Sequence, residues 1–318
     1  MLRNTLWMWL WLTLFSGGCR NGVPENRYTI ATLKGPSSMG MIRLIDSLDN
    51  LKHSEVRVKI LNEPLQVRKM MIDGTADFAI LPSTMAAIIY NKGLDYRLVA
   101  IPVWGTLYLI GNNSSIARWE DLKGKRVFLM ARGMTPDILF RYLLQKNGLN
   151  PDRDLTLDYS FPTHIDLANA INAGQAGLAV ISEPVASLAI KNNPTLNRIF
   201  SLTDEWEKLE DIPIAETAFM ASSTVIKNNP IMVEQILSAY EASTRWVNQY
   251  PDSAAALIIK HGILPDREAA VDAIPRLNLK FVKAETVKGQ IEAYFTVFYM
   301  MNPDVIGGKI PDEDFIYK

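Results

Sequence analysis

The sequence is poor in the residues that most often build metal sites and covalent cross-links. Its 318 residues contain one cysteine, Cys19, and three histidines, His53, His164 and His261, which lie far apart. A single cysteine excludes an internal disulfide, and histidines without metal-ligand spacing give no reason to expect a metal site. We therefore expect a protein that holds neither a metal ion nor another cofactor.

The motifs of common enzyme classes are also missing. There is no phosphate-binding P-loop, the glycines between Gly35 and Gly40 lack the spacing of a dinucleotide fingerprint, and no serine lies in a Gly-x-Ser-x-Gly context. With 33 basic and 34 acidic residues and no long run of one sign, the chain offers no basic surface for phosphates, so nucleic acid is not an expected partner. Nothing here points to an enzyme.

A long hydrophobic run is absent, but a short one lies near the start of the chain. Leu6–Phe15 would rise about 15 Å as a helix, half of the roughly 30 Å hydrocarbon core of a membrane. Residues 1–18 have the layout of a secretory signal. Cys19 follows as in a bacterial lipobox, although Ser16 stands where that pattern usually has leucine. We expect a lipidated Cys19 and a tether over residues 19–26; the alternative is a signal cut nearby, with an incidental thiol.

What the sequence does contain is a duplicated segment. Gly74–Ala87 and Gly174–Ser187, one hundred positions later, share glycine or alanine at four aligned places and apolar residues between them. Both read as a turn, a buried strand, a polar loop and a helix. In a parallel α/β sheet such a loop lies beyond the carboxyl end of a strand, where these folds bind ligands. The duplication predicts two similar lobes whose strand ends face one another.

The order of the predicted elements supports this division. Strands and helices alternate over residues 27–87 and again over 126–187, which is typical of doubly wound α/β lobes. Val99–Gly111 reads as a long strand interrupted at Trp104, and Ile214–Ser222 reads as the second crossing between lobes. The predicted division is lobe I over residues 27–112 and 214–318, and lobe II over 113–213, joined by two crossing strands.

The loops after the strands carry the candidate ligand-binding residues. Many of these residues start a helix, where free backbone N–H groups and the positive end of the helix dipole favour an anionic or strongly polar ligand. For any single hydroxyl a plain N-cap role is an equal alternative, and Ser37 or Ser38, and Thr135, read as caps. The candidates are Pro36, Ser37, Ser38, Met39, Pro82, Ser83, Thr84, Trp104, Gly133, Met134, Thr135, His164 and Glu183.

Several side chains leave two interpretations open. Trp104 is either an aromatic wall of the cleft or a core residue. Glu183 either binds a ligand amine or ring N–H, or forms a latch between the lobes; His164 lies at a matching helix start. Lys34 and Arg132, each next to a loop glycine, either supply charge to an anion or belong to the solvated surface.

Taken together, these segments resemble one protein family. Residues 31–41, 74–79, 121–125, 182–184 and 308–315 are, in their order and spacing, similar to ABC-transporter solute-binding proteins associated with nitrate, sulfonates, taurine and thiamine precursors. The resemblance implies a type II periplasmic-binding fold that closes on a small ligand and delivers it to a membrane permease with a separate ATPase. Gly177, where the first copy has Asp77, departs from the family pattern.

The resemblance and the signal together imply an extracytoplasmic, lipid-anchored monomer in the periplasm or at the surface of a bacterial cell. A ligand sensor of the same fold, without transport, stays open as an alternative. A related pyrimidine-precursor synthase depends on a cysteine-rich iron motif, which a chain with Cys19 alone cannot supply. Menaquinone-pathway enzymes of similar fold are cytoplasmic, so the signal argues against them.

Overall fold

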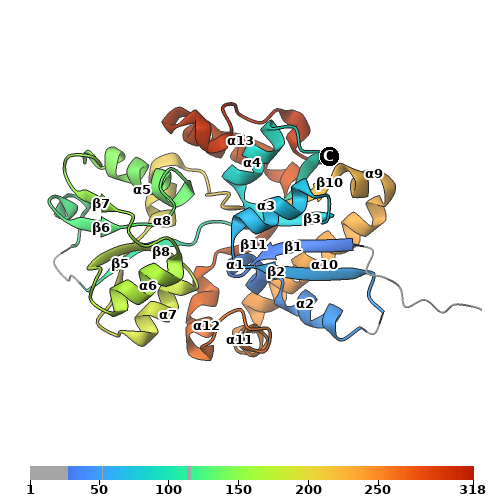
Figure 1. Ribbon diagram of the computed structural model, residues 1–318, viewed down its shortest axis with the longest axis horizontal. Coiled ribbons are helices and arrows are strands. Elements are labelled where there is room, and N and C mark those ends of the chain that lie inside the picture. The colour runs from blue at the N-terminus through green and yellow to red at the C-terminus, as the bar shows by residue number, and fades with distance from the viewer. Residues whose placement is uncertain (1–27, 52, 113–115) are drawn as a thin grey trace, which may run out of the picture.

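The computed structural model describes residues 28–51, 53–112 and 116–318, and shows two lobes side by side (Figure 1). The predicted signal, the tether and Cys19 lie outside the described residues. Each lobe has its own mixed sheet with helices on both faces. The predicted pair of α/β lobes is therefore confirmed.

Lobe I, on the right in Figure 1, is built on a six-stranded sheet in the order β11-β4-β10-β3-β1-β2. The strand β1 pairs in parallel with β2 and β3, whereas β10 runs antiparallel to β3 and β4, and β11 runs antiparallel to β4. The strands are β1 (Tyr28–Leu33), β2 (Val56–Leu61), β3 (Phe78–Pro82), β4 (Tyr96–Val103), β10 (Thr217–Ser222) and β11 (Leu279–Lys283).

The helices of lobe I form two layers because side chains alternate across each strand. On β3, for example, Phe78 and Ile80 pack with the first layer, and Ala79 and Leu81 with the second. The first layer contains α1 (Pro36–Gly40), α2 (Ile42–Asp49), α9 (Ser223–Asn228), α10 (Pro230–Gln249), α11 (Pro251–Lys260) and α12 (Arg267–Ala273). The second contains α3 (Pro64–Ile72), α4 (Ser83–Asn91) and α13 (Lys288–Met301).

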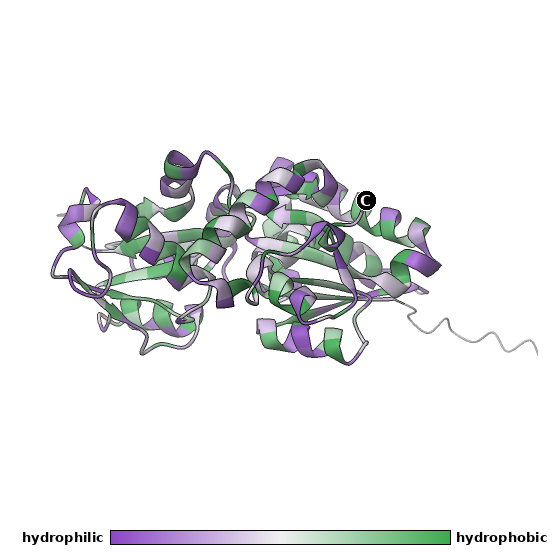
Figure 2. Cartoon of the chain, turned by 90° about the horizontal axis from the view of Figure 1, so that it is seen from above, coloured by the Kyte–Doolittle hydropathy of each residue, from purple (hydrophilic) through white to green (hydrophobic). Residues whose placement is uncertain are grey.

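Lobe II has a five-stranded sheet in the order β7-β6-β8-β5-β9. Its strands are β5 (Leu107–Gly111), β6 (Arg126–Phe128), β7 (Thr156–Asp158), β8 (Leu178–Ser182) and β9 (Asn197–Ser201). Its helices are α5 (Thr135–Lys146) and α8 (Leu202–Glu210) on one face, and α6 (His164–Asn172) and α7 (Val185–Asn192) on the other. Coloured by hydropathy, the strands are mostly green and the outer helix faces largely purple (Figure 2).

The predicted boundary of lobe I after residue 112 is wrong. The strand β5 belongs to the sheet of lobe II, where Leu107 lies opposite Ser182. The chain leaves lobe I at once after β4, through the first crossing, residues 104–106. It returns through residues 211–216, which we call the return crossing. Apolar residues on both sides of the first crossing made two strands of different sheets look like one interrupted strand.

The first crossing contains a glycine that no other residue could replace without rearrangement. Gly105 has a φ of 102°, and a Cβ built on it would lie 2.3 Å from Oγ1 of Thr203 on α8. Positive φ and close approach are the two conditions under which only glycine fits. The first crossing therefore packs directly against a helix of lobe II.

The duplicated segment forms the same local structure in both lobes. Gly74 and Gly174 make the turn before a buried strand, with φ values of 65° and 72°. The strands that follow, β3 and β8, occupy residues 78–82 and 178–182. The residues after each strand therefore lie at equivalent sheet positions, as the sequence predicts.

None of the helices in the described residues combines the length and the apolar character that a membrane crossing requires.

Candidate functional site

The starts of α4 and α5 bring the two lobes into direct contact. Oγ1 of Thr84 in lobe I lies 2.8 Å from Oγ1 of Thr135 in lobe II, at hydrogen-bonding distance. Both side chains are buried, with 4% and 7% of their surface exposed. Two of the predicted helix-start loops thus meet between the lobes, and the structure has the lobes closed at this point.

The predicted N-cap roles, of Ser37 or Ser38 and of Thr135, are wrong. Helix α1 begins at Pro36, so Gly35 is its N-cap, and Ser38 forms hydrogen bonds to the Gly35 backbone with its hydroxyl. Helix α5 begins at Thr135 itself, after Met134, with no side-chain cap. A residue inside the first turn cannot act as the N-cap, and the Thr135 hydroxyl instead reaches across to Thr84 of lobe I.

The start of α4 has no side-chain cap and carries an unpaired hydroxyl. Pro82 stands at the N-cap position, and the N–H of Ser83 donates to the carbonyl of Glu216 on the return crossing (2.9 Å). Ser83 is 1% exposed, and its Oγ has no hydrogen-bond partner in the described residues. Because a buried polar atom is normally hydrogen-bonded, this hydroxyl is suited to a guest molecule.

The loop before α5 is fixed by an aspartate that sequence reasoning missed. Asp137 is 2% exposed and accepts a hydrogen bond from the N–H of Gly133 (2.7 Å). Its other oxygen accepts from the hydroxyl of Tyr159 (2.6 Å) and from Nε of Arg141 (2.8 Å). The available signal was an acidic residue in the first turn of a helix that follows a glycine loop. Asp137 thereby positions the loop that presents Thr135.

The basic side chains beside the loop glycines belong to the surface. Lys34 and Arg132 are exposed, and the Arg132 guanidinium lies 5.2 Å from the centre of the Tyr159 ring. Met134 is also exposed, at 39%. The solvated-surface interpretation of Lys34 and Arg132 is therefore the one that this structure favours. Helix starts and hydroxyls remain the donors at the junction of the lobes.

His164 is a neutral side chain that accepts a hydrogen bond. The N–H of Ser182 donates to Nδ1 of His164 at 3.4 Å, and burial lowers the pKa of the imidazole to about 4. An Nδ1 that accepts a hydrogen bond leaves the proton on Nε2. At neutral pH the side chain therefore offers an N–H group and no charge.

Glu183 supports a latch between the lobes, which is the second of its two predicted roles, by holding Arg198 and Ser187 of lobe II. The side chain is fully buried, and its carboxylate accepts from Nε and Nη2 of Arg198 at 3.0 and 2.7 Å and from the N–H of Ser187 at 3.0 Å. Both oxygens are thus hydrogen-bonded within lobe II. Arg198 also donates to Asp272 of α12 in lobe I, at 2.8 Å.

Asp272 completes this latch, which consists of Glu183, Arg198, Ser187 and Asp272. The hydroxyl of Ser187 donates to Asp272 at 2.8 Å, on the same oxygen that Arg198 contacts. Burial tends to raise the pKa of Asp272, but the hydrogen bonds from Arg198 and Ser187 hold it below its ordinary value. The carboxylate is thus charged, and bound to lobe II, at neutral pH.

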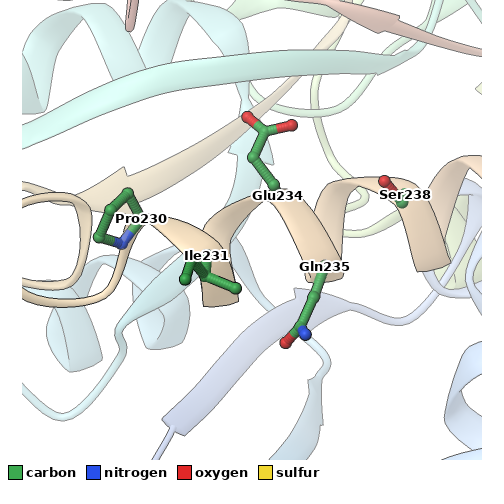
Figure 3. Close-up of a pocket in the computed structure, with 5 residues that line it drawn as sticks. All are labelled: Pro230, Ile231, Glu234, Gln235 and Ser238. Atoms are coloured by element: carbon green, nitrogen blue, oxygen red, sulfur yellow. The ribbon is translucent and has the colours of Figure 1, made fainter.

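Trp104, the first residue of the first crossing, packs against β11. Its Nε1 donates to the carbonyl of Lys280 at 2.7 Å, and the side chain is 7% exposed. It borders a hollow of about 920 Å³ together with residues such as Asn278 and Gln290. A second hollow lies at the start of α10 (Figure 3), lined by Pro230, Ile231, Glu234, Gln235 and Ser238. Trp104 is thus a core residue that also borders a hollow, and its role as a wall of the ligand cleft stays a prediction.

Glu216 is the second residue that sequence reasoning missed. Its Oε1 accepts a hydrogen bond from the hydroxyl of Thr106 on the first crossing, at 2.7 Å. Its Oε2 is buried and has no partner in the described residues. Burial raises the pKa of this carboxyl to about 7, although hydrogen bonds from Thr106 lower it. The signal in the sequence was a lone charged residue in the apolar stretch 212–226.

Metal ligands do not gather anywhere in residues 28–51, 53–112 or 116–318: no three His, Cys, Asp or Glu side chains there are placed to hold an ion.

Comparison with known sequences identifies related proteins. Residues 40–243, more than half of the chain, match the family model described as ABC transporter, phosphonate, periplasmic substrate-binding protein. The protein YtlA of Bacillus subtilis (strain 168) is 26% identical over 132 residues. That match covers 42% of this chain and 37% of YtlA, so it spans little more than a third of the relative's length.

Solved structures share the whole architecture. A crystal structure of an ABC transporter from Parabacteroides distasonis is 27% identical, with a TM-score of 0.79, and the match covers 92% of this chain and 99% of that one. The periplasmic aliphatic sulphonate binding protein SsuA from Escherichia coli is 18% identical, with a TM-score of 0.73, and 92% of each chain is covered. The predicted type II periplasmic-binding fold is confirmed.

Proposed function

The chain belongs to the family of periplasmic substrate-binding proteins of ABC transporters that the model over residues 40–243 describes, and from this premise we propose that it captures a small anionic nutrient for import. The expectation that it is not an enzyme is confirmed by this membership, because the family consists of binding proteins. The proposed ligand range is phosphonates, sulfonates, nitrate and thiamine-precursor-like heterocycles. SsuA, with the same fold and a name that records sulphonate binding, supports the anionic part of this range.

One observation carries the proposal: the contact between Thr84 and Thr135, which joins two helix starts across the lobes at 2.8 Å. Neither helix has a side-chain cap, and the N–H of Ser83 is already bound to the carbonyl of Glu216, so we propose that the other first-turn N–H groups of α4 and those of α5 bind the oxygens of an anion. We propose that the ligand binds between these helix starts and that the lobes close over it. Ser37 of α1 and His164, with its N–H group, are further proposed contacts.

The partners and the anchor are proposed on the same basis. In this proposal the closed protein docks on a membrane permease whose separate ATPase drives import, and the lipid on Cys19 keeps the protein at the outer face of a bacterial membrane. Mass spectrometry of the protein purified from its own membranes tests the anchor. A diacylglycerol-modified Cys19 at the mature N-terminus is expected, and an unmodified Cys19 would remove the anchor from the proposal.

A thermal-shift screen tests the ligand range. A ligand at 100 times its dissociation constant stabilises the folded protein by about 2.7 kcal/mol, which is a readily measured shift in melting temperature. We expect at least one compound from the panel of phosphonates, sulfonates, nitrate and pyrimidine heterocycles to produce it. Thr135→Val is the matched variant, because it removes the hydroxyl and keeps the shape. If no compound shifted the wild-type protein, the proposed range would be wrong.

A further inference from the structure

The hollow beside Trp104 and the contact at Thr84 lie on opposite sides of the segments that join the lobes. At the edge of the lobe I sheet that faces lobe II, paired residues of four strands form one row: Leu279 of β11, Val103 of β4, Thr217 of β10 and Pro82 of β3. The two crossings connect to the middle strands of this row, β4 and β10. Thr84 follows β3 on one side of the crossings, which we call the front. The hollow is lined by Leu279 on the other side, which we call the back.

Lobe II has the same arrangement. Strand β5, which follows the first crossing, pairs with β8 on one side and with β9 on the other. Helix α5 follows β6, the other neighbour of β8, whereas α8 follows β9 directly. The front of lobe II therefore carries Thr135, at the start of α5, and the back carries α8, whose Glu207 lines the hollow. The crossings separate front from back in both lobes.

Two further contacts join the lobes beside the crossings. Trp206 of α8 is fully buried, and the centre of its ring lies 6.0 Å from that of Tyr294 and 6.1 Å from that of Phe298, both on α13 of lobe I. In the other helix layer of lobe I, the latch joins Arg198 to Asp272 of α12. Figure 1 shows α13 above and α12 below the segments that join the lobes. These two contacts and the crossings thus define an axis about which the lobes can turn.

The contacts at the front, along the axis and at the back differ in kind. At the front, Thr84 and Thr135 share one hydrogen bond between neutral hydroxyls. Along the axis, the contacts are a buried aromatic cluster and the ion pair of the latch. At the back, the hollow of about 920 Å³ leaves room between its walls. Because a neutral hydrogen bond contributes little net stability, the front contact is the one that a turn about the axis breaks most easily.

A turn that separates the front must bring the walls of the back together, since the axis lies between them. Protein interiors are close-packed, so such a turn needs free space at the back. We propose that the hollow closes as the lobes open at the front, so that its free volume limits how far they open. Glu207 of α8 lines the hollow together with lobe I residues such as Val282 of β11 and Gln290 of α13. The inference goes beyond the proposed function, because it concerns the movement of the lobes and requires no particular ligand.

Pulsed electron paramagnetic resonance on the purified chain, in a Cys19→Ser background, tests the inference without a ligand. Spin labels at Leu65→Cys and Ile165→Cys form the front pair. Both residues are exposed, on the helices that follow β2 and β7, which are the front edge strands of the two sheets. Labels at Lys191→Cys and Glu268→Cys, also exposed, form the latch pair, which lies near the axis.

A bulky side chain should have opposite effects at the front and at the back. Thr135→Trp places a large ring at the buried front contact, so it is expected to lengthen the distance within the front pair and to change the latch pair much less. Adding Glu207→Trp fills part of the hollow and is expected to remove most of this lengthening. Gln290→Trp, which fills the hollow from the wall of lobe I, is expected to have the same effect.

Two control variants separate the filling of the hollow from other effects. Glu207→Gln removes the same charge without adding bulk, and Leu209→Trp adds a ring at an exposed position of α8 outside the lining of the hollow. Neither is expected to reverse the lengthening that Thr135→Trp causes. All variants are first compared by circular dichroism and melting temperature. If Glu207→Trp does not fold, Gln290→Trp carries the test, and Thr84→Trp replaces Thr135→Trp in the same way.

The distances decide the inference separately from the proposed function. The inference is overturned if the front pair is equally far apart in Thr135→Trp with and without a filled hollow. It is also overturned if Thr135→Trp leaves the front pair unchanged, or separates the latch pair as much as the front pair, because the lobes would then not turn about this axis. None of these results touches the proposed function, which the thermal-shift panel tests with its ligands.

Discussion

Ser83 and Glu183 occupy corresponding positions, one hundred residues apart, directly after the two echoing strands β3 and β8. Their backbones are used alike: the N–H of Ser83 donates to Glu216 on the return crossing, and the N–H of Glu183 donates to Thr106 on the first crossing, both at 2.9 Å. Their side chains differ. The hydroxyl of Ser83 is buried and unpaired, whereas the carboxylate of Glu183 is bound by Arg198 and Ser187.

The comparison separates what a duplicated backbone conserves from what it leaves free. The strand, the turn glycine and the hydrogen bond to a crossing are the same in both copies, because they attach each sheet to the segments that join the lobes. The side chains are used differently. In our proposal Ser83 lies at the junction of the lobes where the ligand binds, whereas Glu183 belongs to the latch of Glu183, Arg198, Ser187 and Asp272. Symmetry in the scaffold therefore does not imply symmetry in the site.

The largest predicted effect comes from breaking the latch. Glu183→Ala leaves Arg198, whose side chain is 18% exposed, without its main partner, and truncating one member of a buried ion pair costs about 3 kcal/mol or more. We expect the free energy of unfolding, measured by urea denaturation, to fall by about that amount. Ser83→Ala at the matching position is the control, with an expected loss below about 1 kcal/mol. Equal losses in the two variants would show that the two positions are energetically alike.

The second prediction concerns the carboxyl that joins the crossings. The folded protein binds the proton of Glu216 up to about pH 7, whereas the unfolded chain releases it near 4.5. Between these values the folded state holds more protons than the unfolded chain, so the free energy of unfolding falls as pH rises. At roughly 1.4 kcal/mol per pKa unit, and with the folded protein relaxing around the ionised carboxylate, the expected fall is about 2 kcal/mol.

Urea denaturation at pH 5 and pH 8 measures this change. Glu216→Gln is expected to be less sensitive to pH over this interval by the same amount, since an amide does not titrate. A wild-type protein and a variant with the same pH dependence would contradict the burial of this carboxyl.

The fold was largely predictable because its signals are local. Gly74 and Gly174, the apolar strands after them and the helix starts at Ser83 and Thr135 can each be recognised within about fifteen residues. The lobe boundary failed for a local reason as well. Val103 and Leu107 lie on strands of different sheets, but the apolar pattern continues through Gly105, and hydrophobicity does not record which sheet a strand joins.

The side-chain partners of the site could not be predicted in this way. Glu183 contacts Arg198, fifteen residues later, and Arg198 in turn contacts Asp272 on the other lobe. No periodicity in the sequence links these three residues. Glu216 read as an ordinary strand residue because its importance comes from burial and from Thr106, 110 positions earlier. Such contacts are set by how segments distant in the sequence pack together, which is a property of the whole chain.

A smaller effect is predicted for the contact between the helix starts. A neutral hydrogen bond contributes about 1 kcal/mol net, so Thr84→Val and Thr135→Val should be coupled by roughly that energy in a double-mutant cycle of unfolding free energies. The control cycle pairs Thr84→Val with Ser187→Ala, which belongs to the latch and should be additive. Additivity in both cycles would show that the hydroxyls do not interact in solution.

The smallest effect is predicted at the edge of the latch, where Lys191 of α7 forms an ion pair with Glu268. Both side chains are largely exposed, at 43% and 77%, and exposed ion pairs contribute little because water and salt screen them. Lys191→Ala should leave the midpoint of urea denaturation unchanged within error at 0.15 M salt. A loss of unfolding free energy comparable to that of Glu183→Ala would show that the exposed ion pair stabilises the protein as much as the buried latch does.

Gly105 marks a part of the molecule, the first crossing, that does not tolerate a larger side chain. A side chain there would act as a wedge between the first crossing and Thr203, and a link only three residues long has no slack with which to move aside. The side chains of Thr84 and Thr135, in contrast, face the junction of the lobes and not the crossing. New ligand preferences can therefore arise in this scaffold by exchanging side chains at the junction, while the first crossing keeps the conformation that Gly105 allows.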